Sequence, residues 1–201
     1  KDGGVKKTLF YFFVNIGELH AGFFNILFGR QAQFTVRNRV IDIILSVLPF
    51  AVLTPLKLLG NVLVFRKIKA KIGGRFKVGV SGGGALPAYV DRLFQAAGIL
   101  LVEGYGLTET APILSVREQL NPVYGTVGPL LRDVEYRLLD SEGNSVSPGE
   151  KGVLYVRSPQ VMKGYYKMPE ETEKVLSEDG WLNTGDLAVF THTGEFTIIG
   201  R

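Results

Sequence analysis

The sequence predicts an α/β fold in which a parallel βαβ unit is preceded by hydrophobic helices and followed by a small β-rich subdomain. Two long apolar runs occupy residues 9–28 and 40–65, and short β-rich runs separated by glycine begin near residue 71. Composition changes at the same point, because the part up to residue 70 carries a net charge of +7 and the remainder carries −3. We therefore expect three segments, at residues 1–70, 71–130 and 131–201.

The composition also excludes several kinds of site. The chain has 201 residues, no Cys and two His, so a disulfide framework, a Cys-ligated metal, a thiol nucleophile and a His-rich metal site are not expected. The lack of Cys favours a cytoplasmic protein. Nucleic-acid binding is not expected either, because the basic residues are dispersed among long aliphatic runs rather than clustered on a polar face.

Residues 1–70 predict amphipathic or buried helices. A membrane-spanning helix needs about 20 consecutive apolar residues, but the longest charge-free run of the second apolar stretch, Ile43 to Leu56, has 14 and contains two prolines. We expect neither stretch to span a membrane. Three alternatives stay open for this segment: peripheral contact with an anionic membrane at its inner face, a tunnel for a long apolar ligand, or ordinary core helices with solvated basic faces.

The centre of the chain predicts the βαβ unit. Residues 76–80 form a strand-like run, residues 87–97 a helix with Pro87 in its first turn and Gly98 after its end, and residues 99–103 a second strand. Strand, helix and strand at this spacing favour a right-handed parallel crossover. The first strand leads into SGGGALP, where three glycines would let a ligand approach the backbone at the carboxyl end of a strand. A tight structural turn explains these glycines about as well.

The second strand leads into EGYGLTETAP, residues 103–112. An aromatic ring can stack on a base, a Thr hydroxyl can bond a phosphate oxygen, and a Glu carboxylate can hold Mg²⁺. An ordinary capped loop with Thr108 as N-cap accounts for the same residues. The glycines of SGGGALP and YGLTET belong to neither of two common nucleotide-binding motifs, because the dinucleotide fingerprint GxGxxG and the phosphate loop GxxxxGK[ST] do not occur in the sequence.

The order of the motifs decides between these alternatives. SGGGALP and YGLTET are followed by YGTVGPLL, VLYVRSPQVMKGYY, WLNTGD and a final GR. This succession resembles the adenylate-forming superfamily of acyl-CoA synthetases, firefly luciferase and peptide-synthetase adenylation domains. The stretch from Phe65 to Pro87 resembles the long-chain fatty acid CoA ligases in particular. The resemblance implies the interior part of the large domain of such an enzyme, without its C-terminal domain.

The resemblance also implies roles for individual residues. The stretch after the first strand would pass close to adenine and the acyl pocket, with Ser81, Gly82 and Gly83 on the acyl side. Thr108 would contact the α-phosphate and Glu109 would hold Mg²⁺, so these two are the expected catalytic residues. Asp186 would take both ribose hydroxyls, for which two carboxylate oxygens are suited. The full nucleotide-binding set implied by the resemblance is Gly82, Gly83, Gly84, Ala85, Tyr105, Gly106, Thr108, Asp186 and Arg201.

Tyr105 is expected to pack on adenine and Arg201 to lie near the ribose. Three other aromatic residues, Tyr165, Tyr166 and Trp181, are expected to pack locally within the β-rich part rather than to contact a ligand.

The implied reaction activates a long-chain fatty acid with ATP as an acyl-adenylate and transfers the acyl group to CoA. The resemblance implies two further parts: a Ser/Thr/Gly-rich loop that ends in Lys-Gly, which would lie upstream and does not occur in residues 1–80, and a C-terminal domain with a catalytic Lys, which would follow the GR motif. We therefore expect the 201-residue chain alone to be inactive. The alternatives are an amino-acid or aryl-acid adenylating enzyme, or a catalytically silent module. The silent module predicts damaged site residues, whereas Thr108, Glu109, Asp186 and Arg201 are intact.

Overall fold

The structure is a computed structural model that describes residues 2–201, and it divides into two compact units. The first unit takes in the chain up to Gln31, then Arg37–Ser81 and Leu86–Val102. The second takes in Ala32–Val36, Gly82–Ala85 and Glu103–Arg201. These boundaries differ from the expected ones at residues 70 and 130. The physical reason is that the N-terminal helices share a core with the βαβ helix instead of forming a body of their own.

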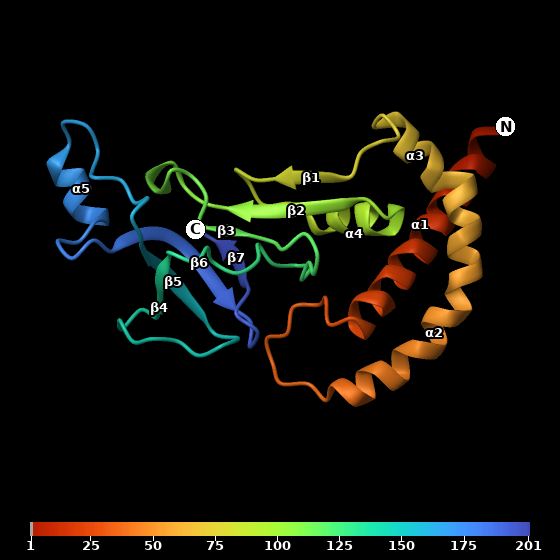
Figure 1. The fold of residues 1–201 in the computed structure, drawn as a ribbon, viewed down its shortest axis with the longest axis horizontal. Helices are drawn as coiled ribbons and strands as arrows, with labels where there is room; N and C mark the ends of the chain where they lie inside the picture. Colours follow the sequence, from red (N-terminus) through yellow and green to blue (C-terminus); the bar gives the residue numbers. More distant parts are fainter. Residues whose placement is uncertain (1) are drawn as a thin grey trace. The chain divides into compact units, whose positions relative to one another are not determined.

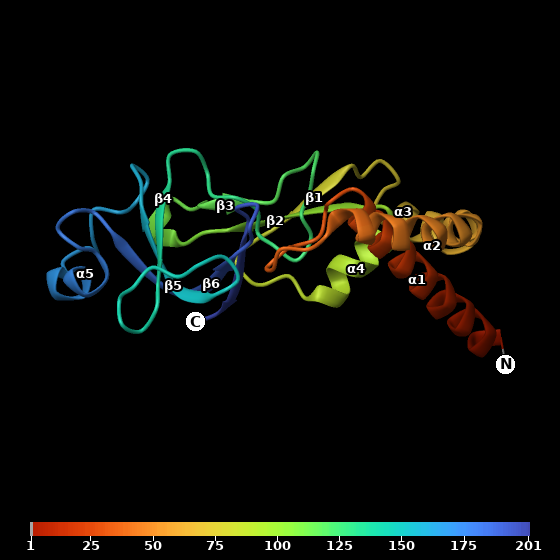
Figure 2. The ribbon, with the colours of Figure 1, turned by 90° about the horizontal axis from the view of Figure 1, so that it is seen from below.

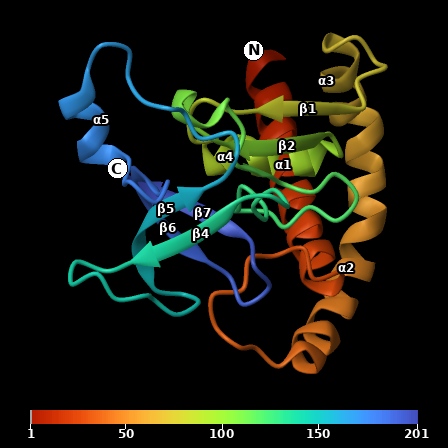
Figure 3. The ribbon, with the colours of Figure 1, turned by 60° about the vertical axis from the view of Figure 1, so that its left-hand side comes forward.

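Two long helical paths dominate the first unit. Helix α1 spans Asp2–Leu27. Helix α2 (Arg39–Gly60) continues through a π-helical turn, η1 (Asn61–Phe65), into α3 (Arg66–Lys71). Helix α2 runs alongside α1 and is visibly curved (Figure 1 and Figure 3). Pro49 and Pro55 lie inside α2, and each removes a backbone donor from the helix, which accounts for the bending.

The core of the first unit joins these helices to the βαβ helix. Val14, Phe65, Ala96, Ala97 and Ile99 form one buried cluster. Gly17 of α1 faces Phe65 of η1. A methyl group in place of the Gly17 hydrogen would lie 2.8 Å from the Phe65 ring, so glycine at position 17 allows α1 and η1 to approach this closely.

Lys57 lies on the inner side of α2, where it is half-buried. Its ammonium group donates hydrogen bonds to Asn61 Oδ1 at 2.7 Å and to the Ala96 carbonyl. Burial, together with a smaller contribution from repulsion by Lys69, lowers the pKa of Lys57 to about 8. Lys57 of α2 thus provides a hydrogen-bond donor for a backbone carbonyl at the carboxyl-terminal end of helix α4.

The βαβ unit forms as expected from the sequence. Strand β1 (Val78–Ser81) is followed by α4 (Ala88–Ala97) and β2 (Leu100–Tyr105). The arrows of β1 and β2 point the same way in Figure 1, and α4 lies against one face of these strands in Figure 2. Gly98 ends α4 with a left-handed φ of 66°, as the sequence predicts. Strand β3 (Ser115–Val116), which the sequence did not predict, pairs antiparallel with the end of β2.

The second unit is built on an antiparallel sheet in the order β4-β5-β6-β7. Its apolar side chains form a core that includes Leu114, Leu138, Leu154, Leu182 and Phe196. The four predicted strands are all present, but β6 begins five residues before the expected run LAVF and therefore includes the NTGD sequence. The sheet consists of β4 (Glu135–Leu139), β5 (Lys151–Arg157), β6 (Leu182–Phe190) and β7 (Phe196–Gly200).

Two short helices complete the second unit. The 3-10 turn η2 (Thr108–Thr110) forms the loop after β2, and α5 (Pro169–Val175) follows β5. Helix α5 has Pro169 at its first position and Glu170 and Glu171 in its first turn, residues that suit a helix N-terminus.

Candidate functional site

The glycine turn after β1 leaves open space beside the backbone. Gly83 has a φ of 77°, a conformation that favours glycine, and a methyl group in its place would meet no atom within 4 Å. At Gly82 the nearest atom to such a methyl group would be the Gly104 carbonyl oxygen, at 3.5 Å. Within the second unit, Gly82–Ala85 therefore runs beside the end of β2, with room for a ligand at its glycines. Ser81 ends β1 in the first unit.

The loop after β2 is held in shape by buried polar contacts. A methyl group in place of the Gly106 hydrogen would lie 1.7 Å from the Pro112 carbonyl oxygen, so this glycine lets the loop close on itself. The Thr110 hydroxyl is fully buried and accepts a hydrogen bond from the Leu107 backbone N–H at 3.0 Å. Thr108 is exposed at the turn. Sequence reasoning assigned Gly106 to the nucleotide and did not select Thr110, whereas the structure gives both a part in shaping the loop.

Two of the expected nucleotide-binding residues, Tyr105 and Arg201, contact the carboxylate of a third, Asp186. The Tyr105 hydroxyl donates to Asp186 Oδ2 at 2.7 Å, and Arg201 Nε lies 3.3 Å from Asp186 Oδ1. Arg201 also donates to the Thr184 carbonyl at 3.5 Å. The Arg201 side chain is largely exposed, while the Asp186 carboxylate is mostly buried. A carboxylate has about four lone-pair positions, so Asp186 keeps acceptor capacity for a hydroxylated ligand.

Local features of β6 aim Asp186 at this point. The Thr184 hydroxyl donates to the Leu154 carbonyl on β5 at 2.8 Å and accepts the Asp186 backbone N–H at 3.1 Å. Gly185 has a left-handed φ of 70°. The pairing register of β6 with β7 shifts between Leu187 and Ala188, and such irregularities commonly re-aim a side chain. The shape of the turn is thus set by residues of the NTGD sequence itself.

Tyr105 acts as a hydrogen-bond donor over the whole physiological pH range. Burial raises the pKa of the Tyr105 hydroxyl, and the hydrogen bond to Asp186 raises it further. The phenol therefore stays protonated and keeps its bond to the carboxylate, which fixes the ring at the end of β2.

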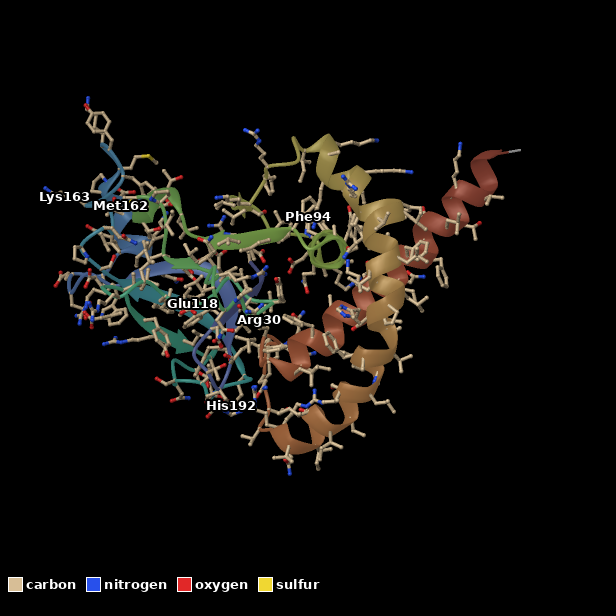
Figure 4. All side chains as sticks on the ribbon, turned by 45° about the vertical axis from the view of Figure 1, so that its right-hand side comes forward. Arg30, Phe94, Glu118, Met162, Lys163 and His192 are labelled. Carbon is tan, nitrogen blue, oxygen red and sulfur yellow. The ribbon has the colours of Figure 1, made fainter. Side chains whose placement is uncertain are left out.

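Two residues of the segment between β5 and α5 form hydrogen bonds to Glu109. The Tyr165 hydroxyl donates to Glu109 Oε1 at 2.7 Å, and the Met162 backbone N–H donates to the Glu109 carbonyl at 2.8 Å. Figure 4 shows Met162 next to Lys163 on this segment. The hydrogen bond to Glu109 raises the pKa of Tyr165. The expectation that Tyr165 only packs locally was therefore wrong.

Of the other two aromatic residues, Trp181 packs within the β-rich part as expected, whereas Tyr166 does not. Tyr166 is 85% exposed, and Lys167 lies over its ring at 5.2 Å. Trp181 is buried, with the guanidinium groups of Arg137 and Arg157 lying 4.0 Å and 4.8 Å from its ring centroid. The chemistry of Tyr165 distinguishes it from its neighbour in sequence, since only its hydroxyl reaches a site residue.

The donor set at Glu109 fits a nucleotide-bound Mg²⁺. In the part of the chain that the structure describes, no three His, Cys, Asp or Glu side chains gather to form a metal cage. Mg²⁺ in nucleotide enzymes is typically held by one or two carboxylates together with phosphate oxygens and water. Glu109 supplies such a carboxylate, with Tyr165 bonded to one of its two oxygens, so a single protein ligand is sufficient for this kind of site.

Sequence reasoning missed a buried ion pair beneath the loop. The Arg117 side chain is fully buried, with Nη2 at 2.8 Å from Glu103 Oε2 and Nε donating to the Thr126 carbonyl at 2.9 Å. Its guanidinium also lies 5.3 Å from the Tyr124 ring centroid. Arg117 thus connects the end of β2 to the YGTVGPLL motif. The sequence signal available was an Arg close to an apolar motif, which does not distinguish a buried side chain from an exposed one.

The Tyr165 contact makes a specific prediction for Mg²⁺-dependent nucleotide binding. Tyr165→Phe removes only the hydroxyl, so Glu109 loses a donor that orients it. Because partners that orient a metal ligand are typically worth 10- to 100-fold in affinity, we expect the Mg²⁺ concentration for half-maximal nucleotide binding to rise about tenfold. Calorimetric titration of Mg²⁺ in the presence of nucleotide measures this.

The neighbouring Tyr166→Phe is the matched control and should leave the Mg²⁺ dependence unchanged. A purely structural role for Tyr165 would instead lower the melting temperature of Tyr165→Phe without altering its Mg²⁺ dependence.

Comparison with known proteins agrees with this geometry. Residues 22–166 match the family of AMP-binding enzymes. The chloroplastic long-chain-fatty-acid–[acyl-carrier-protein] ligase AEE15 of Arabidopsis thaliana is 49% identical over 137 residues, which are 68% of this chain and 19% of that protein. The long-chain-fatty-acid–CoA ligase of Salmonella typhimurium is 37% identical over 157 residues, which are 76% of this chain and 28% of that protein.

Solved structures give the same result. ATP-bound MatB from Rhodopseudomonas palustris matches with a TM-score of 0.54 at 36% identity, over 61% of this chain and 25% of that chain. The chain thus spans between about a fifth and just over a quarter of the length of these relatives. The glycine turn, the YGLTE loop and the family match together lead to one conclusion: the chain belongs to the family of AMP-binding, adenylate-forming enzymes.

Proposed function

We propose that residues 1–201 are the central part of a cytoplasmic, AMP-forming ligase that activates a long-chain fatty acid with ATP. One observation carries the proposal. The hydrogen bond from Tyr105 to Asp186, with Arg201 on the second carboxylate oxygen, joins the loop after β2 to β6. It thereby assembles the residues to which the family resemblance gives the adenine and ribose contacts. The full-length ligase, as named here, is the longer polypeptide in which we propose that this chain lies.

The chemistry requires positioning more than proton transfer. An oxygen of the fatty acid carboxylate forms a bond to the α-phosphorus of ATP, the bond to the bridging oxygen breaks, and pyrophosphate leaves with that electron pair. Both reactants are anions, so charge has to be neutralised where they meet. Mg²⁺, when bound, supplies positive charge to the phosphates.

The chain's own residues have separate tasks in this step. Asp186 orients the ribose through its hydroxyls, Thr108 donates to the α-phosphate, and Glu109 holds the metal. Tyr165 keeps the Glu109 carboxylate oriented. None of these tasks needs a thiol or an imidazole, which suits a chain with no Cys and two His.

The acyl acceptor has two candidates. CoA is the acceptor named for the relative from Salmonella typhimurium, which is 37% identical. An acyl-carrier protein is the acceptor named for the relative from Arabidopsis thaliana, which is 49% identical over a similar stretch. The higher identity is a specific reason to test the carrier protein beside CoA. In either case the acceptor's thiolate sulfur bonds to the acyl carbon, and AMP leaves.

Thioester formation by the full-length ligase tests the proposal. We expect activity with long-chain fatty acids to exceed activity with short or aromatic acids, since the relatives named above are long-chain-fatty-acid ligases. Each acid is assayed with ATP and Mg²⁺, once with CoA and once with phosphopantetheinylated carrier protein. A preference for aromatic or amino acids would overturn the long-chain proposal while leaving the adenylating activity standing.

The chain alone gives a separate prediction. Residues 1–80, which precede the glycine turn, contain no Ser/Thr/Gly-rich loop ending in Lys-Gly, so we infer that the chain lacks the expected grip on the β- and γ-phosphates. We expect the 201-residue polypeptide to release no pyrophosphate above blank with ATP, Mg²⁺ and palmitate. Pyrophosphate release by this polypeptide would show that the loop is dispensable.

A further inference from the structure

One side of α2 and η1 is apolar and exposed along its whole length. Large aliphatic side chains are exposed from Val40 to Leu63, a stretch of helix about 36 Å long. Leu48 is 71% exposed and Leu45 67%. We call this surface the apolar face of α2; it includes Ile44, Leu45, Leu48, Val52, Leu59 and Val62.

The charged residues of this stretch all lie on the other side of the helix. Asp42 is half-buried and pairs with Arg37 at 2.8 Å, while Lys57 points to the Ala96 carbonyl. Ser46 is buried, and Thr54 shares a hydrogen bond with His20 of α1. One side of α2 is therefore committed to protein contacts within the first unit, and the opposite side is apolar with no charge.

The flanks of the apolar face are strongly basic. Residues 43–90 contain seven Lys or Arg and no Asp or Glu. Arg66, Lys67 and Lys71 on α3, together with Arg75 and Lys77 after it, are all exposed. An exposed aliphatic face that continues into a run of unneutralised cations is the pattern of a helix that lies in the interface of an anionic bilayer.

We propose that the apolar face of α2, flanked by the cations of α3, docks this protein on the surface of an anionic membrane. The helix path over residues 39–71 is long and apolar enough to cross a membrane by length and composition. However, the Ser46, Thr54 and Lys57 side is packed against protein, and Lys57 bonds to Ala96 of the βαβ helix α4, which a spanning helix would have to carry into the bilayer. The geometry thus favours a helix lying in the plane of the interface.

This docking explains the exposed side of α2 without a tunnel. The side chains of the apolar face point away from the protein contacts of the first unit, whereas a tunnel wall would need protein on both sides of the ligand. The inference does not depend on the proposed ligase activity. It does agree with a water-insoluble substrate, because a long-chain acid partitions into the same bilayer.

Site-specific labelling of the 201-residue chain tests the proposal. The chain has no Cys, so a single introduced Cys is the only labelling site. Leu48→Cys lies on the apolar face, and Leu120→Cys, 88% exposed in the second unit, is the matched control. With an environment-sensitive fluorophore and vesicles that contain anionic phosphatidylglycerol, we expect a blue shift and a gain in intensity at Leu48→Cys alone. An equal change at both positions, or at neither, would overturn the proposal.

Vesicle co-sedimentation tests the two chemical contributions. Ile44→Ser/Leu48→Ser/Val52→Ser should abolish binding, while Leu120→Ser/Tyr166→Ser/Met168→Ser, which changes exposed apolar residues of the second unit, should not. Arg66→Gln/Lys67→Gln/Lys71→Gln should weaken binding to anionic vesicles about a hundredfold, because each cation near the surface is worth roughly fivefold. Equal partitioning into neutral and anionic vesicles would contradict the charge argument.

Extraction separates surface docking from spanning. Alkaline carbonate releases proteins that lie on a bilayer, so the bound chain is expected in the supernatant after extraction. Retention in the pellet would show a spanning helix instead. Absence of binding to either kind of vesicle would overturn the proposal. Circular dichroism of every variant confirms that the helices remain folded.

Discussion

Asp186→Asn is expected to weaken nucleotide binding by the full-length ligase about 10- to 100-fold. The substitution keeps the size of the side chain but removes its negative charge. In the unchanged protein the charged carboxylate accepts a hydrogen bond from the Tyr105 hydroxyl and lies beside the Arg201 guanidinium. Hydrogen bonds to a charged group contribute about 1.5–3 kcal/mol, and each 1.4 kcal/mol is a factor of ten in affinity. The dissociation constants of ATP and of a non-hydrolysable acyl-adenylate analogue, measured by calorimetry, report the loss.

The control for Asp186→Asn is Tyr105→Phe. It removes the hydroxyl that bonds to Asp186 but keeps both the ring and the carboxylate. We expect a smaller loss of affinity for Tyr105→Phe than for Asp186→Asn, with similar melting temperatures for both. If Asp186→Asn bound the analogue as tightly as the unchanged protein, Asp186 would not hold the ribose.

The second large effect is expected on stability, at the buried ion pair. Arg117→Met leaves the Glu103 carboxylate without its cation in a site that is only 14% exposed. Removing one partner of a buried pair typically costs about 3–5 kcal/mol. We expect a loss of about 3 kcal/mol, at the low end because Glu103 retains some contact with water. Urea denaturation of the 201-residue chain, followed by circular dichroism, measures it.

A double variant separates the charge effect from the loss of packing. In Arg117→Met/Glu103→Leu both charges are gone, so no uncompensated carboxylate remains. We expect the double variant to be more stable than Arg117→Met alone. Equal stability of the single and double variants would mean that Arg117 acts by packing on Tyr124 rather than by neutralising Glu103.

Local sequence patterns predicted the parts of the fold that depend on neighbouring residues. The end of α4 at Gly98 followed from the left-handed conformation that glycine adopts at a helix end. Gly83 followed from the need for open backbone beside a strand end. Asp186 followed from its motif, because Thr184 and Gly185 shape the turn that aims it. In each case the residues that fix the geometry lie within a few positions of one another.

Contacts between distant residues could not be predicted in this way. Tyr165 reaches Glu109 across 56 positions of sequence, and nothing in the string GYYK distinguishes it from exposed Tyr166. Arg117 is buried because Glu103 and the Thr126 carbonyl surround it, and the sequence shows only a basic residue. The sequence left open whether the apolar residues of α2 form a core, line a tunnel or contact a membrane, and the structure shows many of them exposed.

Fatty-acid-dependent exchange of pyrophosphate into ATP tests the central claim most directly. The reaction reports acyl-adenylate formation alone, so it does not depend on whether CoA or a carrier protein accepts the acyl group. With the full-length ligase and Mg²⁺, we predict exchange that requires palmitate and falls at least about tenfold in Asp186→Asn with the fold retained. Exchange that proceeds without a fatty acid, or that is unchanged in Asp186→Asn, would contradict the account.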